Sequence, residues 1–139
     1  MKTVVAAIVI RDGRALLARR RPGESNAGKW EFPGGTVKQG ETPQRALERE
    51  ILEELGVRAA AGPVVARNEH RYPGGAIMLV AVRTELESDG FTLTDHDRAE
   101  WVPLPGLPEY DLSPADIPIA RELAAGAAAR AGIDNIIRS

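Results

Sequence analysis

Three of the four glutamates in the stretch EREILEELG, residues 48–56, have a spacing of three or four positions. On a helix, spacings of three and four would bring Glu50, Glu53 and Glu54 within roughly one quadrant of the surface, beside an apolar sector. Like charges at these spacings repel each other, so helix stability alone would not select them. Charged oxygen ligands at the edge of a core are what a hard divalent cation requires. The stretch therefore indicates a cation site, although a solvated helix face would show the same spacing, because glutamate is also a good helix former.

One helix should carry all three glutamates. Thr42 can cap its N-terminus, Pro43 suits the first helical position, and Gly56 suits the residue that ends a helix. We therefore expect the helix to cover residues 43–55.

The rest of the chain predicts a mixed α/β layered domain. Asp12-Gly13 and Pro73-Gly74-Gly75 each separate two apolar runs and predict two hairpins. The run IMLVAV is nearly all apolar and predicts a central strand. The expected strands cover residues 3–10, 15–18, 30–32, 64–72, 76–86 and 100–102, with a polar loop at 19–29, a glycine loop at 33–35 and an alanine-rich helix at about 113–131.

Composition excludes several classes of function. The chain has 139 residues and a formal net charge of −2, which predicts a single domain, residues 1–139, without the basic surface that long nucleic acid requires. It has no cysteine, so disulfides, thiolate metal sites and a cysteine nucleophile are excluded. No apolar run approaches the ~20 residues of a membrane span. We expect a cytoplasmic protein with no membrane partner.

Residues 35–57 read GTVKQGETPQRALEREILEELGV. This segment resembles the signature of the Nudix hydrolases, G-x5-E-x7-R-E-U-x-E-E-x-G-U with U an aliphatic residue, and fills every fixed position of it. The stretches RRRPGESNAGKWEFPGG, DHDRAEW and LSPADIP resemble the MutT-type branch of that family. The resemblance covers most of the chain and implies a single Nudix domain, an α/β/α sandwich around a central mixed β-sheet.

The resemblance also implies an activity. MutT-type members hydrolyse a nucleoside triphosphate to the monophosphate and pyrophosphate, with Mg²⁺ as the expected cofactor and Mn²⁺ as a substitute. We expect a small nucleotide as partner, a role in sanitising the nucleotide pool, and a monomer or homodimer. Cytidine nucleotides (CTP, dCTP, 5-methyl-dCTP) are the leading substrates, since SPADIP resembles the pyrophosphohydrolases that act on them. The alternatives are an 8-oxo-dGTP diphosphatase and a catalytically silent, nucleotide-sensing Nudix module.

Roles for the acidic residues follow from the same resemblance. Glu50 is expected to be the base or water-orienting group, fixed by Arg49, with Glu53 as the alternative base. Asp95 stands where the branch usually has a glutamate, and its shorter side chain leaves open whether it binds metal or is a solvated loop carboxylate. The same two alternatives apply to the neighbouring Asp97. The expected metal ligands are Gly34 through its carbonyl, Glu50, Glu53, Glu54 and Asp95, and Gly35, Glu41 and Gly56 support them, with Glu41 either an outer ligand or a brace for the loop.

The residues expected to bind the nucleotide are Arg20, Lys29, Phe32 and Asp116. Arg20 matches a phosphate-binding position, a role that Arg19, Arg21 and Lys29 could share. Phe32, and Trp30 with it, could stack on the base or simply pack in the core. Asp116 is an acceptor when ionised, which suits the amino group of cytosine, and it could also cap the last helix. The two histidines, His70 and His96, are expected to be surface or packing groups.

Overall fold

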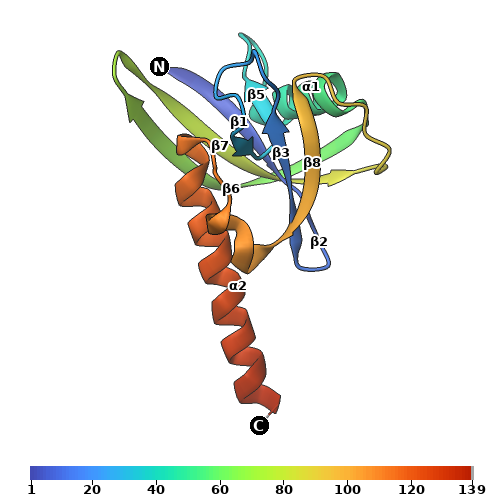
Figure 1. Ribbon diagram of the computed structural model, residues 1–139, viewed down its shortest axis with the longest axis vertical. Coiled ribbons are helices and arrows are strands. Elements are labelled where there is room, and N and C mark those ends of the chain that lie inside the picture. Colours follow the sequence, from blue (N-terminus) through green and yellow to red (C-terminus); the bar gives the residue numbers. More distant parts are fainter. Residues whose placement is uncertain (139) are drawn as a thin grey trace.

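Two four-stranded sheets form the centre of the computed structural model, which describes residues 1–138 (Figure 1). The first sheet is mixed, because its two inner strands, β1 and β7, run parallel while the outer pairings are antiparallel. In the second sheet, β3 pairs antiparallel with its three partners. The first sheet has the order β5 (Gly34–Thr36), β1 (Lys2–Ile8), β7 (Gly75–Leu86), β6 (Ala59–Tyr72), and the second contains β2 (Ile10–Arg11), β3 (Arg14–Arg20), β4 (Trp30–Glu31) and β8 (His96–Pro103).

Helices cover both faces of this β layer. Alternate residues of β1 point to opposite faces: Val5 and Ala7 belong to a core cluster with α1 (Pro43–Leu55). Ala6 and Ile8 belong to a second cluster, with α2 (Ile117–Arg138) and with the 3-10 turns η1 (Leu104–Glu109) and η2 (Pro114–Asp116). The expected α/β/α sandwich with a mixed sheet is confirmed, and its β layer is divided into two sheets.

The bounds expected for α1 are confirmed. Its N-cap is Thr42, whose hydroxyl accepts a hydrogen bond from the Arg45 N–H at 3.2 Å. The helix ends at Gly56, which has a φ of +70°, a left-handed conformation that glycine adopts without a steric cost. One face of α1 is buried through Ala46, Leu47, Ile51 and Leu55, which fixes the direction in which the remaining side chains point.

The N-terminal hairpin differs from the expectation. Only Ile10 and Arg11 pair with the strand after the Asp12-Gly13 turn, whereas β1 leaves for the other sheet and pairs with β7 and β5. A tight turn fixes the pairing of its nearest residues alone. The VVAAI run of β1 is apolar on both faces, which favours an inner position in the mixed sheet, between two helical layers.

The second hairpin is confirmed, with β7 as an inner strand, and both β6 and β8 are longer than expected. The last helix also differs. The 3-10 turn η2 precedes it, and the helix begins at Ile117 and continues to Arg138, beyond the expected end at about residue 131. No helix within residues 1–138 is long and apolar enough to cross a bilayer.

Candidate active site

Arg49 of α1 binds three glutamates: Glu41 in the loop before the helix, and Glu50 and Glu53 on the helix itself. Its Nε and Nη2 donate to the two oxygens of Glu41, at 2.8 and 2.9 Å. Nη1 donates to Glu50 at 2.8 Å and more weakly to Glu53 at 3.4 Å, and Nη2 also reaches the Thr36 carbonyl at 3.0 Å. A guanidinium presents its donors in a rigid fork, so this arrangement fixes the positions of Glu41 and Glu50 relative to β5.

Glu41 is bound at both of its oxygens. The hydrogen bonds from Arg49 lower the pKa of Glu41 to about 2, with a further contribution from the backbone N–H of Lys38 at 2.8 Å. The same contacts raise the pKa of Arg49 above its ordinary value. Glu41 is thus ionised and braces the loop before α1, one of the two roles that the sequence left open.

Glu54 lies at the buried edge of the same helix and is only 6% exposed. Its Oε2 is buried and has no hydrogen-bond partner. Burial raises the pKa of Glu54 to about 9, assisted by the negative charges of Glu31, Glu50 and Asp95 and opposed by Arg20. A carboxyl group in this position must either keep a proton or acquire a positive partner.

Two glycines of β5 allow the sheet to approach α1. A Cβ on Gly35 would lie 2.4–2.7 Å from the carboxyl group of Glu50, and one on Gly34 would lie 1.8 Å from the Val5 carbonyl oxygen. The expected glycine loop is therefore wrong in part, since Gly34 and Gly35 are strand residues paired with β1. Their small size brings the backbone next to the acidic edge of the helix.

The donors fit a divalent cation by type. Among the side chains of residues 1–130, no three from His, Cys, Asp or Glu converge closely enough to hold a metal ion, and Glu50 and Glu53 turn toward Arg49. The unpartnered Oε2 of Glu54 nevertheless lies among other carboxylates, and oxygen donors of this charge suit a hard cation. Residues that could hold one are Gly34, Glu50, Glu53, Glu54 and the partly buried Asp95.

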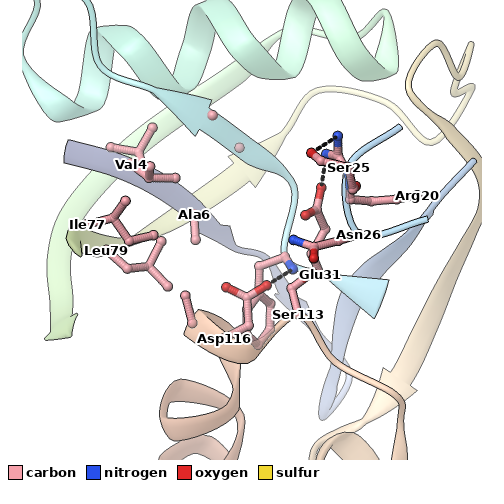
Figure 2. Close-up of a pocket in the computed structure, with 15 residues that line it drawn as sticks. Val4, Ala6, Arg20, Ser25, Asn26, Glu31, Ile77, Leu79, Ser113 and Asp116 are labelled. Atoms are coloured by element: carbon pink, nitrogen blue, oxygen red, sulfur yellow. Dashed lines mark hydrogen bonds and ion pairs between the residues drawn. The ribbon is translucent and has the colours of Figure 1, made fainter. Parts of the chain in front are cut away.

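A cavity of about 260 Å³ begins at the glycines of β5 and ends at η2. In Figure 2, Arg20 and Glu31 lie on one side of it, Val4, Ile77 and Leu79 lie on the other, and Asp116 lies at the end away from α1. Arg20, Phe32, Asp116, Gly34 and Gly35 are the expected site residues that line this cavity. A polar, partly charged wall opposite an apolar one suits a flat, polar ligand with a charged tail.

Lys29 and Trp30 are not among the lining residues. Lys29 Nζ forms an ion pair with Asp111 at 2.7 Å. Trp30 packs edge-on against Tyr110, with 5.2 Å between ring centroids. Arg19 likewise turns away and pairs with Asp97 at 2.8 Å. Of the cations considered for phosphate binding, Arg20 lines the cavity.

Asp116 is 5% exposed, and its Oδ2 accepts a hydrogen bond from the backbone N–H of Phe32 at 3.2 Å. The described contacts include no capping bond from this carboxyl to α2, so the capping role is not supported. Burial raises the pKa of Asp116 well above its ordinary value, and the charge of Glu31 adds to the effect. The protonated form is favoured, and it both donates and accepts. The sequence argument for cytosine took Asp116 in its ionised form, whereas burial in this environment favours the protonated form.

Two residues of the site were missed. Glu31 lines the cavity and receives a hydrogen bond from Arg20 at 3.1 Å. His96 is completely buried, so a surface role for it is wrong, and its Nε2 lies 2.8 Å from Glu31. The sequence feature that could have indicated Glu31 is its position as a single carboxylate between the aromatic residues Trp30 and Phe32. His70 packs near Tyr72 at the end of β6, with 6.3 Å between ring centroids.

Comparison with known proteins adds an independent finding. The model of the NUDIX domain matches residues 1–123. CTP pyrophosphohydrolase of Escherichia coli (strain K12) is 39% identical over 130 residues, which cover 94% of this chain and 96% of that protein. The 8-oxo-dGTP diphosphatase of the same strain is 31% identical over 124 residues, which cover 86% and 94%.

Solved structures agree with the sequence comparison. The solution structure of the E. coli ORF135 protein superposes with a TM-score of 0.82 at 39% identity, over 94% of this chain and 93% of that one. Similarity at this level extends across both sheets and both helical layers.

Proposed function

The chain belongs to the NUDIX family, and from this premise we propose that it is a magnesium-dependent enzyme that hydrolyses nucleoside triphosphates to monophosphate and pyrophosphate. Nudix hydrolases generally use divalent cations and act on small nucleotides; magnesium, with manganese as a substitute, is the finer part of the proposal. The observation that carries it is the position of Glu54. This carboxyl group is buried near the negative charges of Glu50 and Asp95, and its Oε2 has no hydrogen-bond partner. Such a group is costly unless a cation neutralises it.

Different side chains of the site have different roles in the hydrolysis. Glu50 accepts a proton from the attacking water, and Arg49 keeps its carboxylate in place. Glu53, which is more exposed, is the alternative base. A bound divalent cation would supply positive charge that offsets the charge developing on the phosphates. Water adds to a phosphorus of the chain, the bond between the α and β phosphates breaks, and pyrophosphate leaves.

The cavity would bind the rest of the nucleotide. Arg20 offers its guanidinium to the phosphates, and Phe32 forms part of the wall against which the base lies. At the far end, the carbonyl oxygen of protonated Asp116 can accept from the amino group of cytosine, while its hydroxyl donates to the ring nitrogen. Cytidine nucleotides (CTP, dCTP, 5-methyl-dCTP) remain the leading substrates, in keeping with the E. coli relative.

One observation favours a second candidate, 8-oxo-dGTP. A protonated Asp116 can also donate to the carbonyl oxygen of an oxidised guanine and accept from its ring N–H. The relative that is 31% identical bears the name of that activity. In either case the enzyme would remove nucleotides from the precursor pool in the cytoplasm, where they are made and used.

A nucleotide panel tests the proposal. Pyrophosphate release is measured for CTP, dCTP, 5-methyl-dCTP, UTP, 8-oxo-dGTP and ADP-ribose, each with magnesium, with manganese and with EDTA. We expect release from at least one triphosphate, dependent on metal. Glu53→Gln should lower kcat by roughly 100-fold or more, since it removes a charged ligand worth several kcal/mol. Binding without any release, in the presence of metal, would instead favour the nucleotide-sensing module.

A further inference from the structure

His96 is a fully buried residue for which the proposed chemistry has no use. It lies on β8, is 0% exposed, and its Nε2 is 2.8 Å from Oε2 of Glu31. A carboxylate only accepts, so Nε2 carries the proton and donates. The other ring nitrogen, Nδ1, is buried and has no hydrogen-bond partner. The imidazole is thus bound at one end and unsatisfied at the other.

The same oxygen of Glu31 receives a second donor. Arg20 Nη1 lies 3.1 Å from Oε2, so the imidazole and the guanidinium converge on one atom. Strand pairing makes this possible, because β3 lies between β4 and β8 and a register shift between Arg19 and Arg20 places Arg20 opposite His96. The result is a continuous chain, His96 to Glu31 to Arg20. Its last two members, Glu31 and Arg20, lie at the cavity wall (Figure 2).

Stability does not account for this histidine. Burying Nδ1 of His96 without a hydrogen-bond partner costs desolvation free energy. A leucine of similar size would fill the same space without that cost. Arg20, by contrast, gains from the arrangement. An arginine side chain has many rotamers, and binding a phosphate with it is weaker when those rotamers must be lost first. Ser25 and Glu24 bind Nε and Nη2 of Arg20, and a fixed Glu31 restricts the remaining nitrogen, Nη1, before the ligand arrives.

We propose that His96 is a positioning residue for nucleotide binding: it fixes the Glu31 carboxylate, which in turn holds the Arg20 guanidinium ready for the phosphates. This inference rests on the proposed function, in which the cavity binds the nucleotide. Its effect belongs to binding, so it should appear in KM and Kd and leave kcat nearly unchanged.

Two substitutions at position 96 separate positioning from packing. His96→Leu keeps the volume and removes the donor, whereas His96→Gln keeps an N–H that can reach Glu31. KM and kcat are measured for CTP with magnesium, and Kd is measured by calorimetry for a non-hydrolysable CTP analogue. We expect His96→Leu to raise KM and Kd about tenfold, the loss of one charge-assisted hydrogen bond, with kcat within about twofold. His96→Gln should restore most of the affinity.

A packing role predicts the opposite order, with His96→Leu neutral and His96→Gln impaired, and that order would overturn the inference. Thermal unfolding should place His96→Leu at or above the wild type, which excludes misfolding as the cause of weaker binding. The control is Thr84→Val, which removes a buried hydroxyl from β7 away from the cavity and should leave KM unchanged.

A double mutant tests the path through Arg20. Arg20→Ala alone should raise Kd, and adding His96→Leu should raise it little further, because the positioned group is already gone. Fully multiplicative effects contradict the inference. If the wild type hydrolyses CTP while His96→Leu binds the analogue with unchanged Kd, the inference fails and the proposed function stands. If the wild type binds no CTP analogue, the inference fails, and if in addition no triphosphate of the panel is hydrolysed, the proposed function fails with it.

Discussion

Glu54 is a buried carboxyl group close to the negative charges of Glu31, Glu50 and Asp95. Its pKa is raised from 4.5 to about 9 in the folded protein, so between these values the folded state keeps a proton that the unfolded state has lost. The metal-free protein should therefore lose stability as pH rises from about 4.5 to 9, by at most ~1.4 kcal/mol per pH unit from this group. Glu54→Gln should remove the contribution of Glu54 and make the slope shallower, as measured by urea denaturation in EDTA at pH 6 and pH 8, while the raised pKa of Asp116 contributes a slope of the same sign in both proteins.

Glu53→Gln is the matched control for that experiment. It makes the same Glu-to-Gln change on the same helix, but the Glu53 side chain is 56% exposed. The pH slope should survive in Glu53→Gln, while both variants lose turnover. An equal slope in the wild type and Glu54→Gln would show that the Glu54 carboxyl ionises freely in the folded protein.

Asp116 gives a second prediction at the residue scale. Because burial favours its protonated form, an amide should replace it with little change in function. Asp116→Asn should keep the ratio of kcat/KM for CTP and UTP within about threefold, whereas Asp116→Leu should lower kcat/KM for CTP about tenfold through lost hydrogen bonds. A collapse of the CTP preference in Asp116→Asn would mean that the carboxyl is ionised when the base is bound.

Spacing alone was enough to predict the glutamates on one face of a helix, because helix geometry is local. Glu31 and His96 could not be found in that way. They are 65 positions apart and meet only because β4 and β8 both pair with β3. The raised pKa of Asp116 was equally inaccessible, since it depends on the burial of the carboxyl group and on the charge of Glu31.

At the scale of elements, the approach of β5 to α1 decides where Glu50 lies. A methyl group on Gly35 would occupy the space of the Glu50 carboxyl, at 2.4–2.7 Å. Gly35→Ala should therefore displace Glu50 and lower kcat by roughly 10 to 100-fold, the usual consequence of a misplaced catalytic group. The measurement is steady-state kinetics of pyrophosphate release, with circular dichroism to establish that the fold persists.

Gly126→Ala provides the control for a glycine replaced by alanine. Nothing lies within 4 Å of a Cβ at Gly126, which is on the exposed part of α2. This variant should keep full turnover and gain up to about 1 kcal/mol of stability from helix propensity. Equal losses of activity in both variants would mean that the Glu50 contact is not the reason for Gly35.

Elements with a strong local signal were predicted well. Capping and stop residues fixed α1 at 43–55, and Pro73-Gly74 fixed the second hairpin. The first hairpin failed because the Asp12-Gly13 turn specifies only its neighbours, while the partner of β1 is chosen by burial against β7 and β5. Long-range pairing of this kind is decided by the whole core.

For the whole molecule, metal binding and folding should be coupled. A cation that binds the folded state alone stabilises it, by about 2.7 kcal/mol at a concentration 100 times its Kd. Magnesium should therefore raise the denaturation midpoint of the wild type. The gain should be larger at pH 8 than at pH 6, because binding must displace the proton of Glu54. The double variant Glu53→Gln/Glu54→Gln should show no gain, and an equal gain there would place the cation elsewhere.

The most direct test of the central claim is ³¹P NMR of CTP incubated with the protein and magnesium. If the acidic edge of α1 promotes attack within the triphosphate chain, the CTP signals should be replaced by those of CMP and pyrophosphate in equal amounts, and EDTA should prevent the change. Formation of CDP and orthophosphate, or release that persists in EDTA, would contradict the account.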